Sequence, residues 1–237
     1  MVRNSLHKPT VEGAKTIAFL NAEVGADILK ADYANVIAAV NQLAVEQKVA
    51  ILAVCVSALS GPQPSNNEAV RIAAVRVLVA LLPTSLAAIA DLLSRCQNKH
   101  HYEVHFTLFC YLDWAQEMPD AFSLTEDVLL LVENYLMTVP RKTARAAWMA
   151  GDMLGEHWNE QEAVPLLMKT AQGAKYSVGR LQSVFGLAHM LDRLPVESDT
   201  HKSILKALRK ISSSDPSKDV RKNAKGELRD WRKSLRK

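Results

Sequence analysis

Four stretches of the chain repeat one pattern, in which an arginine lies one turn into a helical segment and mostly small or apolar residues follow three and six positions later. These stretches are AVRIAAVRVLVAL (69–81), TARAAWMAGDMLG (143–155), VGRLQSVFGLAHML (178–191) and DVRKNAKGELRDW (219–231). Their arginines are Arg71, Arg145, Arg180 and Arg221, and two further segments place Ile37 and His105 there. Successive members of this series are 34, 34, 40, 35 and 41 residues apart. A period in this range is typical of stacked helical hairpins.

Helical spacing of apolar residues extends over most of the chain, and breaking or capping residues interrupt it at short intervals. The separators include GPQPSNN, LPTS, MPDAFS, VPRKT, AQGAK, LPVESD and SSSDPS. The predicted helices are 11–29, 33–45, 47–60, 67–82, 84–97, 101–117, 124–138, 141–157, 160–172, 176–193, 199–212 and 217–235. Because no convincing strand pattern is present and the connections are short, we predict an all-α fold of about six hairpins.

The segment DPSKDVRKNAKGEL (215–228) follows a turn aspartate with Val-Arg and then small residues. This pattern resembles the second helix of a HEAT-repeat hairpin, including the bacterial HEAT-like (phycobilin lyase-type) repeats. The resemblance covers nearly the whole chain, although Ile37 and His105 depart from the arginine position. It implies an α-solenoid of about six HEAT-like hairpins in a single domain over residues 1–237. Residues 199–237 would then form a basic C-terminal capping repeat, since a terminal repeat needs a polar outer face.

The chain shows no signal for a membrane or an oxidising compartment. Its longest apolar stretch, residues 49–60, is shorter than the roughly 20 residues of a membrane-spanning helix. The N-terminus MVRNSLHKPT lacks an apolar signal region, and the three cysteines form no CxxC motif. We therefore expect a cytoplasmic protein with no membrane contact.

The last predicted helix carries cations on one face. The chain has a net charge of +4, yet from Lys202 onward it has 13 Lys/Arg against 4 Asp/Glu. Six of these cations recur at helical spacing: Lys218, Lys222, Lys225, Arg229, Arg232 and Arg236. The equivalent positions of earlier repeats are mostly apolar, for example Val75 and Val184. The row is interpreted first as a solvent-facing end cap, and also as a candidate site for phosphates or an acidic partner.

Side chains able to carry chemistry are sparse. His101 and His105 have the spacing of a metal pair, but HExxH is missing and His105 replaces the recurring arginine, so a structural role is favoured. We predict no metal and no cofactor. Asp113, Asp152 and Glu156 lie near tryptophans, which raises the HEAT-like fold of alkylpurine DNA glycosylases as an alternative, but no catalytic motif carries over.

These observations favour a non-catalytic HEAT-like scaffold that binds a protein partner on its curved surface. The candidate aromatic anchors are Tyr102, Tyr111, Trp114, Trp148 and Trp158. The alternative is a nucleic-acid-binding protein, with or without glycosylase-like activity, that uses the C-terminal cations. A continuous positive groove would favour nucleic acid, whereas a neutral or acidic surface would favour a protein partner.

Overall fold

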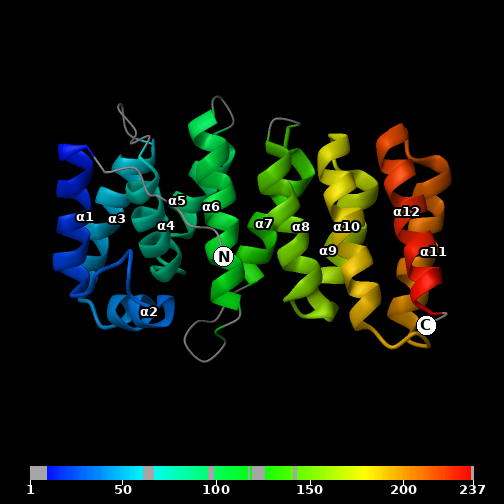
Figure 1. Cartoon of the computed structure of the whole chain (residues 1–237), viewed down its shortest axis with the longest axis horizontal. Helices are drawn as coiled ribbons and strands as arrows, with labels where there is room; N and C mark the ends of the chain where they lie inside the picture. Colours follow the sequence, from blue (N-terminus) through cyan, green and yellow to red (C-terminus); the bar gives the residue numbers. More distant parts are fainter. Residues whose placement is uncertain are drawn as a thin grey trace. The chain divides into compact units, whose positions relative to one another are not determined.

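The computed structural model describes residues 10–60, 67–95, 99–116, 118, 126–140 and 143–235. These residues form twelve α-helices and no β-strand, so the predicted all-α class is confirmed (Figure 1). The chain divides into two compact units, residues 1–125 and 126–237, and each is described here by itself. The continuous single domain therefore stays a prediction.

The helix bounds follow the predicted ones closely. The first unit holds α1 (Val11–Val24), α2 (Tyr33–Asn41), α3 (Val45–Ser60), α4 (Glu68–Ala80), α5 (Leu86–Ser94) and α6 (Lys99–Gln116). The second unit holds α7 (Glu126–Thr138), α8 (Ala144–Glu156), α9 (Glu160–Gly173), α10 (Ser177–Arg193), α11 (Asp199–Ser214) and α12 (Lys218–Ser234). The first two helices end earlier than predicted, and the other bounds agree within three residues.

Local hydrogen bonds explain where the helices begin and why α1 ends early. Five helices begin after a residue whose side chain accepts a backbone N–H of the first turn, namely Thr10, Asp32, Asn67, Asn159 and Ser198. Helix α1 ends just before Gly25, which caps it. The φ of Gly25 is 71°, in the left-handed region that glycine adopts without a steric cost. The Asn21 side chain then accepts the N–H of Ile28 at 2.9 Å, which fixes the chain outside the helix.

In the first unit, α4 packs against α1, α2, α3 and α6. Arg71, one of the recurring arginines, reaches from α4 to α6, where its Nε donates to Thr107 Oγ1 at 3.3 Å. Its guanidinium also lies 3.9 Å from the Glu103 carboxylate. The recurring arginine therefore joins two neighbouring second helices through side-chain contacts.

The second unit consists of three hairpins, α7–α8, α9–α10 and α11–α12. Helices α8, α10 and α12 pack side by side in one layer, while α7, α9 and α11 contact one another in order in the other layer (Figure 1). A buried ion pair joins two of these hairpins: Arg180 Nε and Nη2 donate to Asp215 Oδ2 and Oδ1 at 2.8 and 3.2 Å. Asp215, in the turn between α11 and α12, thus anchors Arg180 of α10.

Glycines allow α8 and α10 to approach closely. A Cβ added at Gly155 would lie 2.6 Å from the Gly186 carbonyl oxygen, and one added at Gly186 would lie 2.5 Å from the Gly151 carbonyl oxygen. Contacts this short leave no room for a side chain. The close approach also brings the polar residues next to these glycines within reach of the facing helix.

Candidate functional site

Helix α12 presents the predicted cations to solvent. We call the exposed residues Lys218, Lys222, Lys225, Arg229 and Arg232 the basic row. On the opposite side, Val220, Ala224 and Leu228 are buried against the rest of the unit. Arg236, the sixth predicted member, lies outside the described residues. The exposure of these five cations agrees with the predicted cationic face of this helix.

The equivalent row in the preceding second helices is covered. Val184 in α10 is fully buried, as is Met153 in α8, whereas Lys225 and Arg229 of α12 are exposed. Helix α12 packs on α10, and no described helix of the second unit packs on the outer side of α12. The exposure of the basic row therefore follows from its place at the end of this stack.

Most cations of the basic row have no ion-pair partner among the described residues. Arg229 Nε lies 3.3 Å from Asp230 Oδ1, which Lys233 Nζ also approaches at 3.3 Å. Lys218, Lys222 and Lys225 have no carboxylate within ion-pair distance in the part of the chain that the structure describes, and the same holds for Arg232. These charges are free to meet an anionic ligand.

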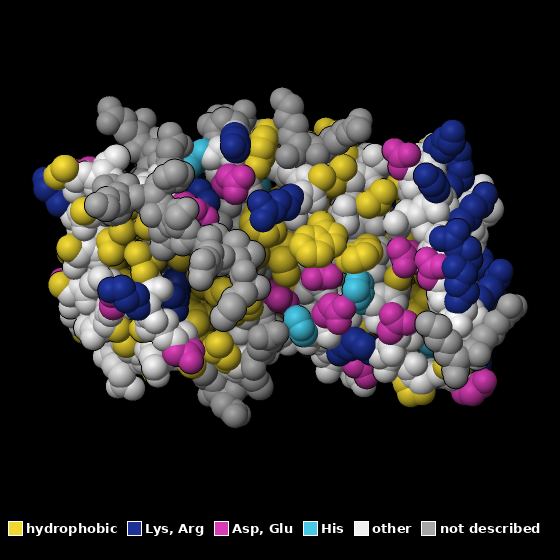
Figure 2. All heavy atoms as spheres, in the orientation of Figure 1, with side chains coloured by type: hydrophobic (Ala, Val, Ile, Leu, Met, Phe, Trp, Pro, Cys, Tyr) yellow, Lys and Arg dark blue, Asp and Glu magenta, His cyan; other side chains and the backbone are white. Residues whose placement is uncertain are grey.

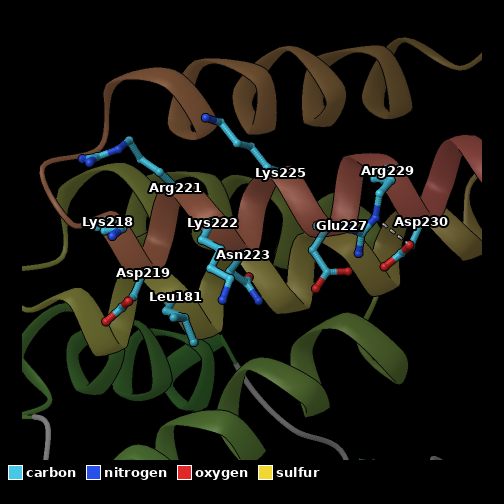
Figure 3. A pocket seen from close by; sticks show the side chains of 11 residues that line it. Leu181, Lys218, Asp219, Arg221, Lys222, Asn223, Lys225, Glu227, Arg229 and Asp230 are labelled. Carbon is cyan, nitrogen blue, oxygen red and sulfur yellow. Dashed lines mark hydrogen bonds and ion pairs between the residues drawn. The ribbon is translucent and has the colours of Figure 1, made fainter.

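The basic row borders an open groove of about 890 Å³ that α12 forms with Leu181 of α10. Figure 3 shows Lys222, Asn223 and Glu227 over α10, while Lys225 points to the other side of α12. Asp219, Glu227 and Asp230 line the same groove, so its charge is mixed. Burial raises the pKa of Glu227 above its ordinary value; Asp230 and Asp192 add to the effect, and His189 opposes it.

Two of the five predicted aromatic anchors belong to the core. Trp158 is 2% exposed, and its Nε1 donates to Glu162 Oε2 at 2.9 Å. Tyr111 is 7% exposed and packs edge-on against Trp114, with ring centroids 4.8 Å apart. Neither side chain offers a surface for a partner. Tyr111 lies on α6 and Trp158 lies in the turn between α8 and α9, and the sequence alone does not show whether either ring faces the core or the solvent.

The other three aromatics differ in exposure. Tyr102 is half-buried, Trp114 is 46% exposed and Trp148 is 38% exposed. Trp148 belongs to the second unit, where its ring lies 6.3 Å from that of Phe185 on α10. Phe185 in turn meets the His189 ring at 4.4 Å. The structure thus adds Phe185 and His189, which the sequence did not single out, to one aromatic run across α8 and α10.

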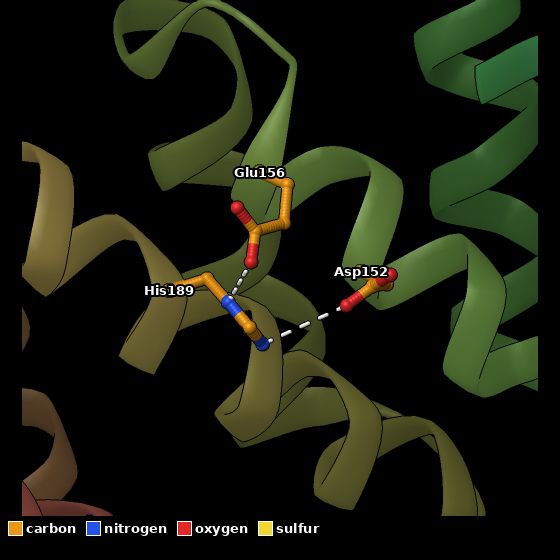
Figure 4. Close-up of side chains that lie close together, drawn as sticks. All are labelled: Asp152, Glu156 and His189. Atoms are coloured by element: carbon orange, nitrogen blue, oxygen red, sulfur yellow. Dashed lines mark ion pairs between the residues drawn. The ribbon is translucent and has the colours of Figure 1, made fainter. Parts of the chain in front are cut away.

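Three polar side chains gather beside this aromatic run. Asp152 and Glu156 come from α8, one helical turn apart, and both face His189 of α10 (Figure 4). Burial raises the pKa of Asp152, and the nearby His189 opposes that effect. In the part of the chain that the structure describes, Asp152, Glu156 and His189 are close enough together for all three to contact one metal ion.

His105, one member of the predicted histidine pair, takes a structural role. His105 is fully buried, and its Nε2 lies 2.9 Å from the Leu92 carbonyl oxygen. Burial lowers the pKa of His105 to about 4, so the ring is neutral at pH 7.

Comparison of the chain with models of known protein families, with curated proteins and with solved structures finds no match. No helix in the described part of the chain is long and apolar enough to cross a membrane.

Proposed function

We propose that this chain is a non-catalytic HEAT-like α-solenoid of about six hairpins that binds a protein partner across α8, α10 and α12. The 34- to 41-residue period supports the repeat architecture. The three stacked hairpins of the second unit support it as well. So does the Arg180–Asp215 pair, which links a recurring arginine to the turn of the next repeat.

The observation that carries the proposal is the mixed character of this one layer. Within the second unit, Figure 2 shows hydrophobic side chains over α8 and α10, acidic side chains beside them and Lys and Arg gathered along α12. Trp148 and Phe185 supply the aromatic part, and Asp152 and Glu156 supply negative charge on α8. Aromatic residues in the middle and charges at the rim are characteristic of protein interfaces.

The charge distribution favours a protein over a nucleic acid. Nucleic-acid affinity depends on many phosphate contacts along a positive surface. The exposed cations of this layer are concentrated on α12, and acidic residues line the same groove. A protein partner with an acidic segment for the basic row and an apolar part for Trp148 matches this arrangement better.

Nucleic-acid binding through the basic row is the second candidate, because Lys218, Lys222, Lys225 and Arg232 have no ion-pair partner among the described residues. Spaced at three and four residues, the row extends about 20 Å along the helix. Such a row can contact several successive phosphates. A glycosylase-like activity would be expected to disappear on Asp113→Asn or on Asp152→Asn, each tested separately in a variant that circular dichroism shows to be folded.

The experiment compares two charge reversals of equal size. One variant carries Lys222→Glu, Lys225→Glu and Arg229→Glu in α12. Its control carries Lys206→Glu, Arg209→Glu and Lys210→Glu, which lie exposed on α11 of the same hairpin. Purified full-length protein and both variants are used as bait in nuclease-treated and untreated extracts of the source cells, and bound proteins are quantified.

A specific protein partner is expected to be retained by the wild type and the α11 control, and lost from the α12 variant, regardless of nuclease treatment. Binding that disappears with nuclease would instead support nucleic acid. In that case, affinity for a DNA or RNA duplex should fall steeply with salt and be weakened by the α12 reversal. Equal losses in both variants would contradict any specific role of the basic row.

A further inference from the structure

Asp152, Glu156 and His189 form a compact group on the face shared by α8 and α10. His189 Nε2 lies 3.6 Å from Asp152 Oδ1, and His189 Nδ1 contacts Glu156 Oε1. One ligand atom from each residue lies within 4.8 Å of the others. The side chains of Asp152 and His189 are 21% and 24% exposed, and that of Glu156 is 41% exposed. The group is therefore held in place and still reachable from solvent.

The backbone brings these residues together. Asp152 and Glu156 directly follow Gly151 and Gly155 in the sequence GDMLGE. Because both glycines lie against the α10 backbone, the two carboxylates lie at the edge of the closest contact between the helices. A Cβ at Gly155 would approach the His189 Cβ to 2.9 Å, so a larger residue there would push the histidine away.

The three side chains offer the atoms that divalent transition-metal ions prefer. Zinc binds imidazole nitrogen and carboxylate oxygen at about 2.0 to 2.2 Å. Two ligands of one tetrahedral ion are consequently about 3 to 4 Å apart. The Asp152–His189 separation of 3.6 Å already falls in that range. Figure 4 shows the two carboxylates at different ring nitrogens, with Asp152 facing Nε2 and Glu156 facing Nδ1. Because a single ring nitrogen ligates the ion, an ion at Nε2 beside Asp152 requires the exposed Glu156 side chain to rotate from Nδ1 toward it.

We propose that Asp152, Glu156 and His189 bind a divalent transition-metal ion, with zinc as the representative case. Three protein ligands leave at least one coordination position open to solvent. The imidazole nitrogen favours a transition-metal ion over magnesium, because magnesium prefers ligands that are all oxygen atoms. The site lies within the surface proposed for the protein partner, but all its ligands come from this chain, so metal binding can be tested without the partner.

The test measures metal binding directly in the untagged, chelator-treated full-length protein. Zinc is titrated by calorimetry, and cobalt is titrated by visible absorption, which reports coordination geometry. The variants are Asp152→Asn, Glu156→Gln and His189→Gln. The control is Asp192→Asn, which removes an exposed carboxylate one turn further along α10 than His189. Circular dichroism establishes that each variant is folded.

One equivalent of zinc is expected to bind to the wild type and to Asp192→Asn. Each ligand variant should lose that equivalent or bind it at least about tenfold more weakly. Cobalt should give absorption bands of four- or five-coordinate geometry that His189→Gln abolishes. If Asp152→Asn fails to fold, the more exposed Glu156→Gln remains decisive. Absence of saturable binding, or binding that Glu156→Gln and His189→Gln both retain, overturns the proposal.

Discussion

Helices α10 and α12 are the second helices of successive hairpins, but their equivalent positions have opposite surroundings. One, four and eight residues after the recurring arginine, α10 has Leu181, Val184 and Ala188, which are buried or half-buried. At the same positions α12 has Lys222, Lys225 and Arg229, all exposed. Both helices bury their other face. In this unit, cations on α12 take the place of the apolar row of α10, and no further described helix of the unit covers them.

The largest expected difference between the two helices concerns their arginines. Arg180→Met would leave the buried Asp215 carboxylate without its bidentate partner. Loss of one member of such a pair costs about 3 to 5 kcal/mol. Arg229→Met removes only an exposed pair with Asp230 and should change the free energy of unfolding by less than about 1 kcal/mol. Urea unfolding of both variants measures the difference, and equal effects would contradict the distinction.

A matched pair of glycines gives the next largest effect. A Cβ at Gly179 in α10 would lie 1.9 Å from the Leu136 carbonyl oxygen, whereas a Cβ at Gly226 in α12 meets nothing within 4 Å. Gly179→Ala is expected to destabilise the protein by about 3 kcal/mol through overpacking. Gly226→Ala is expected to stabilise it by up to about 1 kcal/mol because alanine favours helix. Thermal unfolding distinguishes the two, and a stable Gly179→Ala variant would contradict the close approach of Gly179 in α10 to Leu136 in α7.

Making α12 resemble α10 should create a new contact surface. Lys222→Leu, Lys225→Val and Arg229→Ala place the residues of the α10 row on a face that no described helix of the unit covers. An uncovered apolar row of this kind promotes association. Light scattering should show self-association that increases with protein concentration, while the α11 variant Lys206→Leu, Arg209→Val and Lys210→Ala serves as the positional control. A monomeric α12 variant would indicate that this row does not behave as an open end.

The smallest expected effect involves Glu227, which lies between α12 and α10. Its pKa is raised in the folded protein, mainly by burial, so folding is favoured when the group is protonated. Stability should therefore fall as pH rises from the ordinary pKa of glutamate through the raised folded value. Glu227→Gln should remove this dependence and stabilise the protein at pH 7 by less than about 0.5 kcal/mol. Denaturant unfolding at pH 4 and pH 7 checks the sign, and a destabilised variant at pH 7 would contradict it.

The sequence predicted the helices and the orientation of α12 because both depend on local patterns. Capping residues such as Asn67 and Ser198 mark helix starts through bonds to their own first turn. Helical spacing of Val220, Ala224 and Leu228 separates the buried face from the cations. These features depend on neighbours within a few residues, and the structure confirms them.

Features that depend on contacts between helices were harder to predict. The sequence allowed Trp158 to be either an exposed anchor or a core residue, and its burial in the structure shows that it belongs to the core. His189 gave no signal alone, since its significance comes from facing Asp152 and Glu156 on another helix. The glycines of GDMLGE were the available indication, because glycine within a helix often marks close packing. Which helix they would face required the structure.

The most direct test of the account replaces equivalent residues of α10 and α12 by the same side chain. Val184 is fully buried and Lys225 is exposed, and both lie four residues after the recurring arginine. Val184→Gln should lower the free energy of unfolding by about 3 kcal/mol because it buries an amide in an apolar setting. Lys225→Gln should change it by less than about 0.5 kcal/mol. A loss at Lys225 as large as that at Val184, measured by urea unfolding, would contradict an open cationic face on α12.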